Sequence, residues 1–477
     1  MPASTPPPYP TLRLPQIAVF NLLIFAWWLE VGLRVSLLAA IRFEFLLAAT
    51  CIVMAVLHAQ ATPRPRIRPK AESNSDIIKC SVVFVIVLAL SLPFALNFQI
   101  AWNSFFNRVV KLAIIGLLLP QFVVSPFTLR IYLFTTLLAF LKIGQEAFLG
   151  KVTGSMVWYN QGVPRLHGEP GTMFGHPNSL SGKTVSLLPW MWYIYPTVQR
   201  HWVKLLLILQ LVFSINIIIF TGSRTGYLTV IAVALLTIAL AKKYRGRLLI
   251  AFVAAAIATV IFVPQEYKDR FTSAFTGVEA EGKSADTRKA LFFDSLQAFA
   301  DNPIGVGISC FPLYQAIHKR NAQDTHNLYT QLLAETGLQG FLCFLALLYV
   351  VLRKAFRCRK VFMSLIGKLE QSAPSNPSDE AINSELRDVR LLLATTNALI
   401  VFTFTRLALG VFGHDLLEIY WWLAAGTAMA LHNMRLVAER RCEVLLQKNA
   451  SGADLALSHT VRHERYKSPR YPLQRKL

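Results

Sequence analysis

Apolar runs separated by short polar breaks follow one another along most of this chain. Each run is roughly 16 to 25 residues long, which is the length that an α-helix needs to cross a hydrocarbon core of about 30 Å. The runs predict about twelve transmembrane helices, at 14–30, 41–58, 77–96, 109–124, 127–144, 178–197, 203–220, 226–241, 248–263, 337–352, 389–409 and 416–434. We therefore expect an all-α integral membrane protein.

Basic residues are distributed around these runs in a regular way. Clusters follow the second, sixth, eighth and tenth predicted spans, at 64–70, 200–204, 242–247 and 353–360. Lys and Arg in short loops stay on the cytoplasmic side of a membrane, and all four clusters follow even-numbered spans. The pattern predicts that both termini are cytoplasmic.

The composition agrees with membrane insertion. Hydrophobic residues make up 54% of the chain and the mean hydropathy is +0.45, which is too apolar for an ordinary soluble protein. Loops at membrane exits and a basic C-terminal segment account for the formal net charge of +22, and membrane lipids are expected partners. Because the basic residues are scattered, nucleic acid is not expected as a partner. The 6 cysteines show neither a disulfide framework nor metal-ligand spacing.

The spans divide the chain into five regions. We predict a disordered tail at 1–13, nine transmembrane helices within 14–263, a large non-cytoplasmic loop at 264–336, three further transmembrane helices within 337–434 with a cytoplasmic linker at 353–388, and a basic cytoplasmic tail at 435–477. Two further segments, about 145–177 and the turn 221–225, fall on the same side of the membrane as the large loop. In that loop, apolar spacing predicts a helix over 287–300, and a second helix opens at Thr325 or Asn327.

Arg224 stands in the turn between the seventh and eighth predicted spans. Glycines on both sides permit a sharp turn. An arginine at the start of a helix adds five hydrogen-bond donors to the positive end of the helix dipole, which suits a phosphate group. The alternative is an interfacial arginine whose side chain reaches lipid headgroups.

Arg288 and His326 lie in the large loop. Arg288 is on the predicted helix, and His326 is in the first turn of the helix that leads to the tenth span. A histidine with its ordinary pKa of about 6.5 accepts a proton near neutral pH. Taken singly, Arg288 reads as a solvated surface residue and His326 as a packing or capping residue. The predicted topology places both on the same side of the membrane as Arg224, which favours shared chemistry.

The earlier loop ends in a polar, glycine-rich stretch that contains Arg165, His176 and Asn178. This stretch is either a rigid re-entry into the membrane or a set of substrate contacts. Lys183, just inside the sixth span, and Arg406, near the outer end of the eleventh, are cations within the membrane, which are usually functional or paired.

Four short motifs then follow one another in order. They are Gly-Thr-Met-Phe-Gly-His-Pro-Asn at 171–178, Thr-Gly-Ser-Arg-Thr-Gly at 221–226, Asn-Pro-Ile-Gly-Val-Gly at 302–307, and Thr-His-Asn-Leu-Tyr at 325–329 with Glu335, Gly337 and Gly340 behind it. In this order and at these membrane positions, the chain resembles the O-antigen ligase and polysaccharide polymerase superfamily over about residues 160–350.

The resemblance implies a C-type glycosyltransferase-like membrane fold with a catalytic periplasmic loop at 264–336. It assigns catalysis to His326 and diphosphate binding to Arg224 and Arg288. Arg270 is a rival to Arg288, because spacing in this loop varies among relatives. The remaining candidates are possible substrate contacts, at Arg165, His176, Asn178, Lys183, Asn327 and Glu335.

The resemblance further implies an enzyme of the bacterial inner membrane that acts on glycan carried by undecaprenyl diphosphate. Two arginines would stabilise the departing diphosphate, and His326 would take the proton of the acceptor hydroxyl, with inversion at the sugar. Neither a metal nor another cofactor is expected, since the chain has no Asp-x-Asp pair. The acceptor stays open: a second lipid-linked glycan for a polymerase, or lipid A core or a protein hydroxyl for a ligase.

A transporter or flippase, for a lipid-linked or small-molecule substrate, is the alternative from another functional class. Charged residues in or near the spans, such as Glu30, Arg34 and Lys111, favour it. Transporters of this kind are often built from internal repeats. The sequence shows no such repeat, and its polar motifs gather in external loops, so we favour the enzyme.

Overall fold

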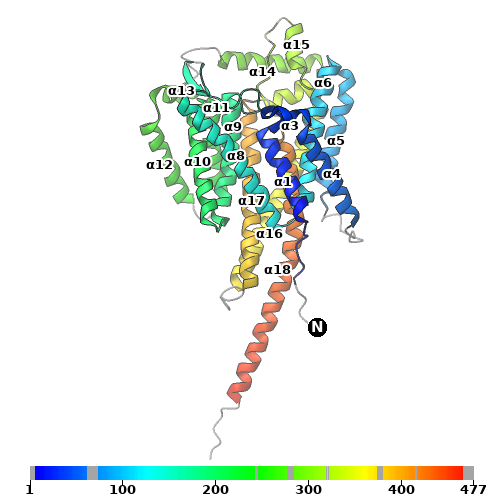
Figure 1. The fold of residues 1–477 in the computed structure, drawn as a ribbon, viewed down its shortest axis with the longest axis vertical. Helices are drawn as coiled ribbons and strands as arrows, with labels where there is room; N and C mark the ends of the chain where they lie inside the picture. The colour runs from blue at the N-terminus through cyan, green and yellow to red at the C-terminus, as the bar shows by residue number, and fades with distance from the viewer. Residues whose placement is uncertain are drawn as a thin grey trace, which may run out of the picture.

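The computed structural model describes residues 6–61, 73–160, 162–241, 245–276, 284–318, 320, 322–372, 380–413 and 416–465. These residues form a helical bundle with a cap of shorter helices at one end (Figure 1). The first part of the chain forms α1 (Leu14–Leu29), α2 (Val31–Arg34), α3 (Ser36–Ala40), α4 (Phe43–Ala61), α5 (Ser75–Ser91) with the 3-10 turn η2 (Leu92–Phe94), α6 (Phe98–Ser104), the π-helical η3 (Phe105–Val110), α7 (Lys111–Phe122) and α8 (Pro126–Thr153).

The second part begins with a small antiparallel hairpin of β1 (Val157–Asn160) and β2 (Val163–Leu166), in which Val157 pairs with Leu166 and Asn160 with Val163. It continues with α9 (Pro177–Ile194), η4 (Tyr195–Thr197), α10 (His201–Phe220), α11 (Arg224–Leu240), α12 (Arg245–Phe262), α13 (Gln265–Thr276), α14 (Ser284–Asp301), α15 (Phe311–Ile317), α16 (Leu328–Ser372), α17 (Glu380–Gly410) and α18 (Tyr420–Arg465).

Every predicted span coincides with a helix in the described part of the chain. Within that part, six helical segments are long and apolar enough to cross a membrane: Ser75–Phe94, Phe98–Phe122, Pro126–Thr153, His201–Phe220, Leu328–Ser372 and Glu380–Gly410. Three shorter apolar helices are Leu14–Leu29, Phe43–His58 and Arg224–Leu240. The protein is therefore an all-α integral membrane protein, and the total of about twelve spans stays a prediction.

Aromatic side chains link the helices of the bundle centre. The Phe344 ring of α16 lies 5.0 Å from that of Trp421 in α18 and 5.9 Å from that of Phe84 in α5, measured between centroids. On the other side of the bundle, Phe20 of α1 stacks on Phe122 of α7 at 4.8 Å. These contacts join residues far apart in sequence, so packing of apolar faces determines the helix arrangement.

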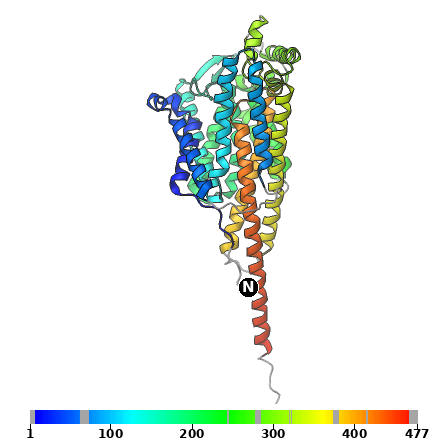
Figure 2. The same cartoon turned by 90° about the vertical axis from the view of Figure 1, so that its right-hand side faces the viewer.

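The predicted linker 353–388 and tail 435–477 are helical where the structure describes them. α16 continues to Ser372, α17 begins at Glu380, and α18 extends to Arg465, well beyond the bundle (Figures 1 and 2). Buried apolar residues explain the extensions, because Leu365 and Leu369 of α16 and Ile382 and Leu386 of α17 recur at helical spacing. Residues 373–379 and 466–477 lie outside the described residues.

The N-terminal segment does not match the prediction of a disordered tail, because its described part, residues 6–13, is held in place. The Tyr9 hydroxyl donates to Glu385 Oε1 over 3.2 Å, and Arg441 Nη1 donates to the Pro7 carbonyl over 2.8 Å. Arg441 Nε also donates to Glu385 Oε2 over 2.7 Å. The start of the chain therefore lies beside α18, so both ends of the described chain are at the same end of the bundle. The basic clusters at 64–70 and 242–244 lie outside the described residues.

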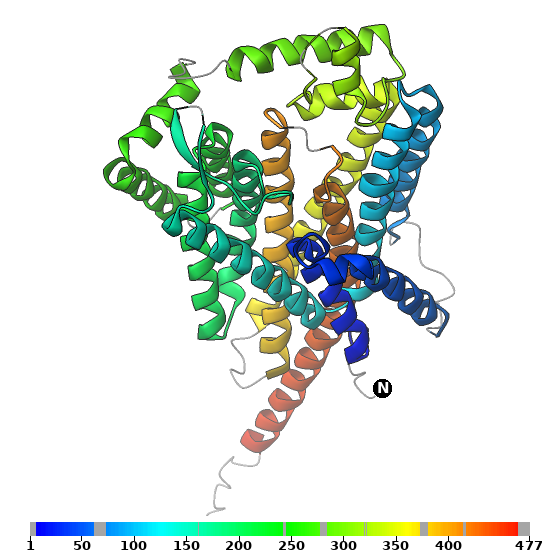
Figure 3. The ribbon, with the colours of Figure 1, turned by 45° about the horizontal axis from the view of Figure 1, so that its top comes forward.

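The opposite end of the bundle carries α13, α14 and α15 (Figures 1 and 3). α14 confirms the helix predicted over 287–300, whereas α13, α15 and the hairpin are not predicted by the sequence pattern. The Tyr267 hydroxyl of α13 donates to the Pro164 carbonyl of β2 over 2.6 Å. The hairpin and the large loop thus form one cap over this end of the bundle.

A kink in α16 anchors the loop at 302–307. Gly337 has φ 67° and ψ −175°, a conformation that is nearly restricted to glycine. The kink redirects backbone groups: Leu338 N–H donates to the Pro303 carbonyl, and the Ala334 carbonyl accepts from Val306 N–H over 2.8 Å. The Asn-Pro-Ile-Gly-Val-Gly motif therefore fastens the cap to α16.

Replacing Gly337 by alanine is expected to lower the free energy of unfolding by about 2 to 4 kcal/mol, combining backbone strain and steric overlap. A Cβ atom there would lie 2.5 Å from the Pro303 and Ile304 carbonyl oxygens. The measurement is thermal or denaturant unfolding in detergent. Gly367→Ala in the same helix is the control, since no atom lies within 4 Å of its Cβ position. Equal stability of the two variants would contradict the proposed role of the kink.

Candidate functional site

Arg224 is the first residue of α11 and follows a tight turn after α10. Gly222 in the turn has a φ of 57°, a left-handed conformation that glycine adopts without steric cost. The Ser223 hydroxyl accepts a hydrogen bond of 3.2 Å from the Gly226 N–H and so caps α11. Arg224 therefore lies at the positive end of a helix dipole, where an anion is favoured.

Two other arginines hold the carbonyl groups of this turn. Arg165 of β2 donates from Nε to the Thr221 carbonyl over 2.8 Å, and Arg270 of α13 donates from Nε to the Gly222 carbonyl over 2.5 Å. Carbonyl groups at the end of a helix lack partners within the helix and need such donors. Arg165 and Arg270 thus position the turn that carries Arg224.

Arg288 lies on α14, which crosses over the end of the bundle (Figure 3). It shares one face of the helix with Phe292, because residues four apart lie above one another. The side chains of Arg288, Lys289 and Phe292 all face the cavity described below. Arg288, unlike Arg270, is thereby brought directly to the cavity that Arg224 lines.

His326 precedes α16, whereas the sequence pattern predicts it in the first turn of that helix. Its φ is 49°, a left-handed conformation that is uncommon outside glycine but enriched for histidine and asparagine. Asn327 caps the helix, since its Oδ1 accepts from Tyr329 N–H over 2.9 Å and from Thr330 N–H over 3.1 Å. The Asn327 amide also donates to the Val411 carbonyl over 3.0 Å. The backbone of His326 is therefore fixed between α16 and the end of α17.

Arg224, Arg288 and His326 meet at one cavity of about 300 Å³. Its walls come from α11, α13, α14, the segment before α16 and the end of α17, through Arg224, Thr225, Leu228, Ser273, Arg288, Lys289, Phe292, Thr325, His326, Asn327, Val411 and Phe412. This lining contains three cationic side chains and no carboxylate among the described residues. The cavity is thus positively charged, with an imidazole in its wall.

The positive charge around the cavity lowers the pKa of a neighbouring arginine. Burial, and after it the guanidinium groups of Arg270, Arg224 and Arg288, lower the pKa of Arg165 to about 9. The Arg165 side chain is only 2% exposed, so solvent screens this repulsion poorly. Four guanidinium groups therefore crowd one small region, and a multiply charged anion in the cavity would relieve the repulsion.

Two further candidates, Asn178 and His176, are connected to this region through Arg165. Asn178 Oδ1 accepts from Arg165 Nη2 over 2.7 Å, and His176 Nδ1 accepts from the Asn178 N–H over 3.1 Å at the start of α9. Neither residue lines the cavity of Arg224. These hydrogen bonds place both residues behind the arginine that holds the turn.

Lys183 and Glu335 lie apart from the cavity of Arg224. The Lys183 ammonium donates to the Met173 carbonyl over 2.9 Å, and the side chain lines a second, larger cavity. Glu335 is 1% exposed within α16, and its Oε2 accepts from Gln331 Nε2 over 3.2 Å. The structure therefore brings neither residue to the arginines and His326.

Two lining residues are missed by the sequence pattern. Lys289 follows Arg288 directly and adds a third cation to the cavity, and the basic pair is the available signal. Ser273 of α13 also lines the cavity, and no local pattern marks it, because α13 itself is not predicted. Among the described residues, no group of three His, Cys, Asp or Glu side chains could hold a metal ion.

We compared the chain with curated proteins and with models of protein families. No curated protein matches the chain. The family model described as O-antigen ligase matches residues 209–345, a stretch that contains Arg224, Arg270, Arg288 and His326. The match contains three of the four motifs and confirms the resemblance: residues 209–345 are similar to the O-antigen ligase family, which supports the O-antigen ligase and polysaccharide polymerase superfamily.

Proposed function

We propose that the chain is an inverting, metal-independent glycosyltransferase that moves glycan from an undecaprenyl diphosphate carrier to a hydroxyl acceptor in surface polysaccharide assembly. The match of residues 209–345 to the O-antigen ligase family supports glycan transfer of the ligase or polymerase type in general. The observation that carries the finer proposal is the single cavity lined by Arg224, Arg288 and His326, which come from three separate segments.

In the proposed reaction, Arg224 and Arg288 bind the diphosphate and His326 acts as general base. The imidazole takes the proton of the acceptor hydroxyl, and the oxygen attacks the anomeric carbon of the carrier-linked sugar. The bond from that carbon to the diphosphate oxygen breaks, and its electron pair leaves with the diphosphate. Guanidinium groups placed where this charge develops lower the barrier. Lys289 adds a further positive charge at the cavity wall.

The proposed location follows from the predicted orientation in a bacterial inner membrane. With both termini cytoplasmic, the cap of α13, α14 and α15 and the cavity beneath it face the periplasm. Ser273→Cys, which lies in this cavity, should then react with an impermeant thiol reagent added to intact spheroplasts. Reaction only after the membrane is permeabilised would reverse the proposed orientation.

Reconstituted transfer tests the proposed activity. The full-length protein in liposomes is supplied with undecaprenyl diphosphate-linked glycan and, in separate reactions, a second lipid-linked glycan or lipid A core. Formation of a product with the opposite anomeric configuration, in the presence of a chelator, is the expected result. Exchange of glycolipid between leaflets without any new glycosidic bond would indicate a flippase instead.

Pyrophosphate is expected to stabilise the protein against heat because it mimics the diphosphate. At a concentration about 100 times its Kd, the gain in unfolding free energy is about 2.7 kcal/mol. The double variant Arg224→Gln/Arg288→Gln should lose this gain. Arg353→Gln, an exposed arginine on the distal part of α16, should keep it. Equal stabilisation of all three proteins would place the anion elsewhere.

A further inference from the structure

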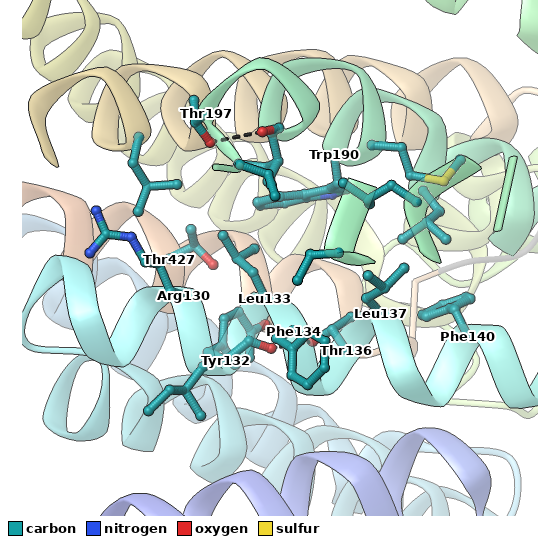
Figure 4. A pocket seen from close by; sticks show the side chains of 18 of the residues that line it. Arg130, Tyr132, Leu133, Phe134, Thr136, Leu137, Phe140, Trp190, Thr197 and Thr427 are labelled. Carbon is teal, nitrogen blue, oxygen red and sulfur yellow. Dashed lines mark hydrogen bonds between the residues drawn. The ribbon is translucent and has the colours of Figure 1, made fainter. Parts of the chain in front are cut away.

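A second cavity, of about 740 Å³, lies between the helices of the bundle (Figure 4). Its walls are formed mainly by α8, α9, α10, α17 and α18, and most of the lining side chains are apolar, among them Leu133, Leu137, Phe140, Trp190 and Leu207. None of Arg224, Arg288 and His326 lines it. The proposed glycan transfer reaction therefore assigns no role to this cavity.

The cavity covers about two thirds of the hydrocarbon core. Along α8 its wall runs from Phe127 to Phe140, which is about 20 Å at a rise of about 1.5 Å per residue. The hydrocarbon core is about 30 Å thick, so the cavity spans one leaflet and part of the other, a length that suits one extended acyl chain. Arg130 and Thr197 lie at one end of it and Phe140 at the other (Figure 4). The end at Arg130 is the end of the bundle where the chain termini lie, because Arg130 pairs with Asp388 near the start of α17.

This end of the cavity carries three of its four cationic side chains, and the fourth, Lys183, lines the other end. Arg130, Arg200, Arg387 and Asp388 form the rim. Arg130 Nη2 lies 2.5 Å from Asp388 Oδ1, so Arg200 and Arg387 supply the positive charge that this ion pair does not cancel. Both of these arginines are exposed. An apolar channel with a basic mouth matches the two parts of an anionic lipid, and basic residues at this position attract anionic headgroups.

We propose that this cavity binds one acyl chain of an anionic glycerophospholipid from the leaflet on the side of the chain termini, with the lipid phosphate at Arg200 and Arg387. The site is independent of the proposed glycan transfer. The polyprenyl chain of a glycan donor fits less well, because its diphosphate would lie at Arg224, at the opposite end of the bundle. The bound phospholipid would fill the space between α8 and α17 and stabilise their packing.

The test uses the full-length protein in nanodiscs made of phosphatidylcholine and phosphatidylglycerol in equal parts. The protein is released, and native mass spectrometry measures the lipids that stay bound. Arg200→Gln/Arg387→Gln should lower retention of phosphatidylglycerol about tenfold for each arginine replaced. Leu133→Trp fills the apolar wall and should also lower retention. Arg390→Gln, an exposed arginine of α17 that pairs with Glu370, is the matched control and should bind as the wild type does.

A thermal unfolding transition is measured for each variant first, to establish that the variant is folded before its bound lipids are measured. Equal retention by the wild type and the Arg200→Gln/Arg387→Gln variant would overturn the proposal. Equal retention of phosphatidylcholine and phosphatidylglycerol by the wild type would show that the site does not select an anionic headgroup, which would contradict the proposal. Displacement of phosphatidylglycerol by added undecaprenyl phosphate, in a manner that Leu133→Trp abolishes, would assign the cavity to the polyprenyl chain instead.

Discussion

Replacing His326 by asparagine is expected to lower the turnover number for glycan transfer by about 10² to 10⁴-fold, the usual contribution of a general base. Asparagine is chosen because residue 326 has a positive φ, and asparagine tolerates this conformation better than alanine does. The variant keeps a polar side chain and the backbone of the segment but has no group that accepts a proton. The measurement is initial-rate transfer by the reconstituted protein.

The pH dependence separates a base from a structural residue. The ordinary pKa of an imidazole is about 6.5, so loss of the base should remove the rise in rate near neutral pH, whereas a packing defect would lower the rate at every pH alike. His318→Asn is the control, since His318 is exposed at the end of α15 in the same cap. A His326→Asn protein with the wild-type rate and pH profile would end the general-base proposal.

Replacing Arg224 or Arg288 by glutamine is expected to lower the turnover number by about 10² to 10³-fold, the usual effect of removing one group that stabilises a developing negative charge. Both side chains line the cavity with His326. Lysine at either position should recover only part of the rate, because it keeps the charge but loses the planar pair of donors that fits a phosphate. Transfer rates and thermal unfolding are measured on the same preparations.

Comparing Arg270→Gln with Arg288→Gln shows which of these two arginines binds the diphosphate. Arg270 holds the Gly222 carbonyl, so its loss should lower the thermal stability of the protein. Arg288→Gln should leave stability unchanged or raise it, because it removes a positive charge from a crowded cluster. Loss of turnover in Arg270→Gln with full stability, beside an active Arg288→Gln protein, would exchange their proposed roles.

Arg165, which lies outside the cavity, gives the polar residue Asn178 of the motif at 171–178 a structural role. Asn178 binds Arg165, and Arg165 binds the turn before Arg224. Asn178, at the end of this motif, is therefore linked through Arg165 to the turn that carries Arg224. A substitution of Asn178 is expected to shift Arg224 without any direct contact between residue 178 and the substrate.

The hydrophobic pattern by itself determined the fold class and the presence of a helix at every predicted span, because a helix in a membrane must satisfy its own backbone and present an apolar surface over a fixed length. It also determined the turn at Arg224, since Gly222 and Ser223 act locally. The hydrophobic pattern was less informative about where the helices end outside the membrane. α16, α17 and α18 run on past their spans because Leu365, Leu369, Ile382 and Leu386 pack against other helices, which no hydropathy threshold records.

Only the tertiary structure decided which candidates meet. Arg224, Arg288 and His326 share a cavity, whereas Lys183 lines a different one and Glu335 is buried beside Gln331. The binding of the N-terminal segment to Arg441 was likewise invisible in the sequence. The physical reason is common to these cases: a contact between segments hundreds of residues apart depends on the packing of whole helices, and it leaves no mark on the local spacing of either segment.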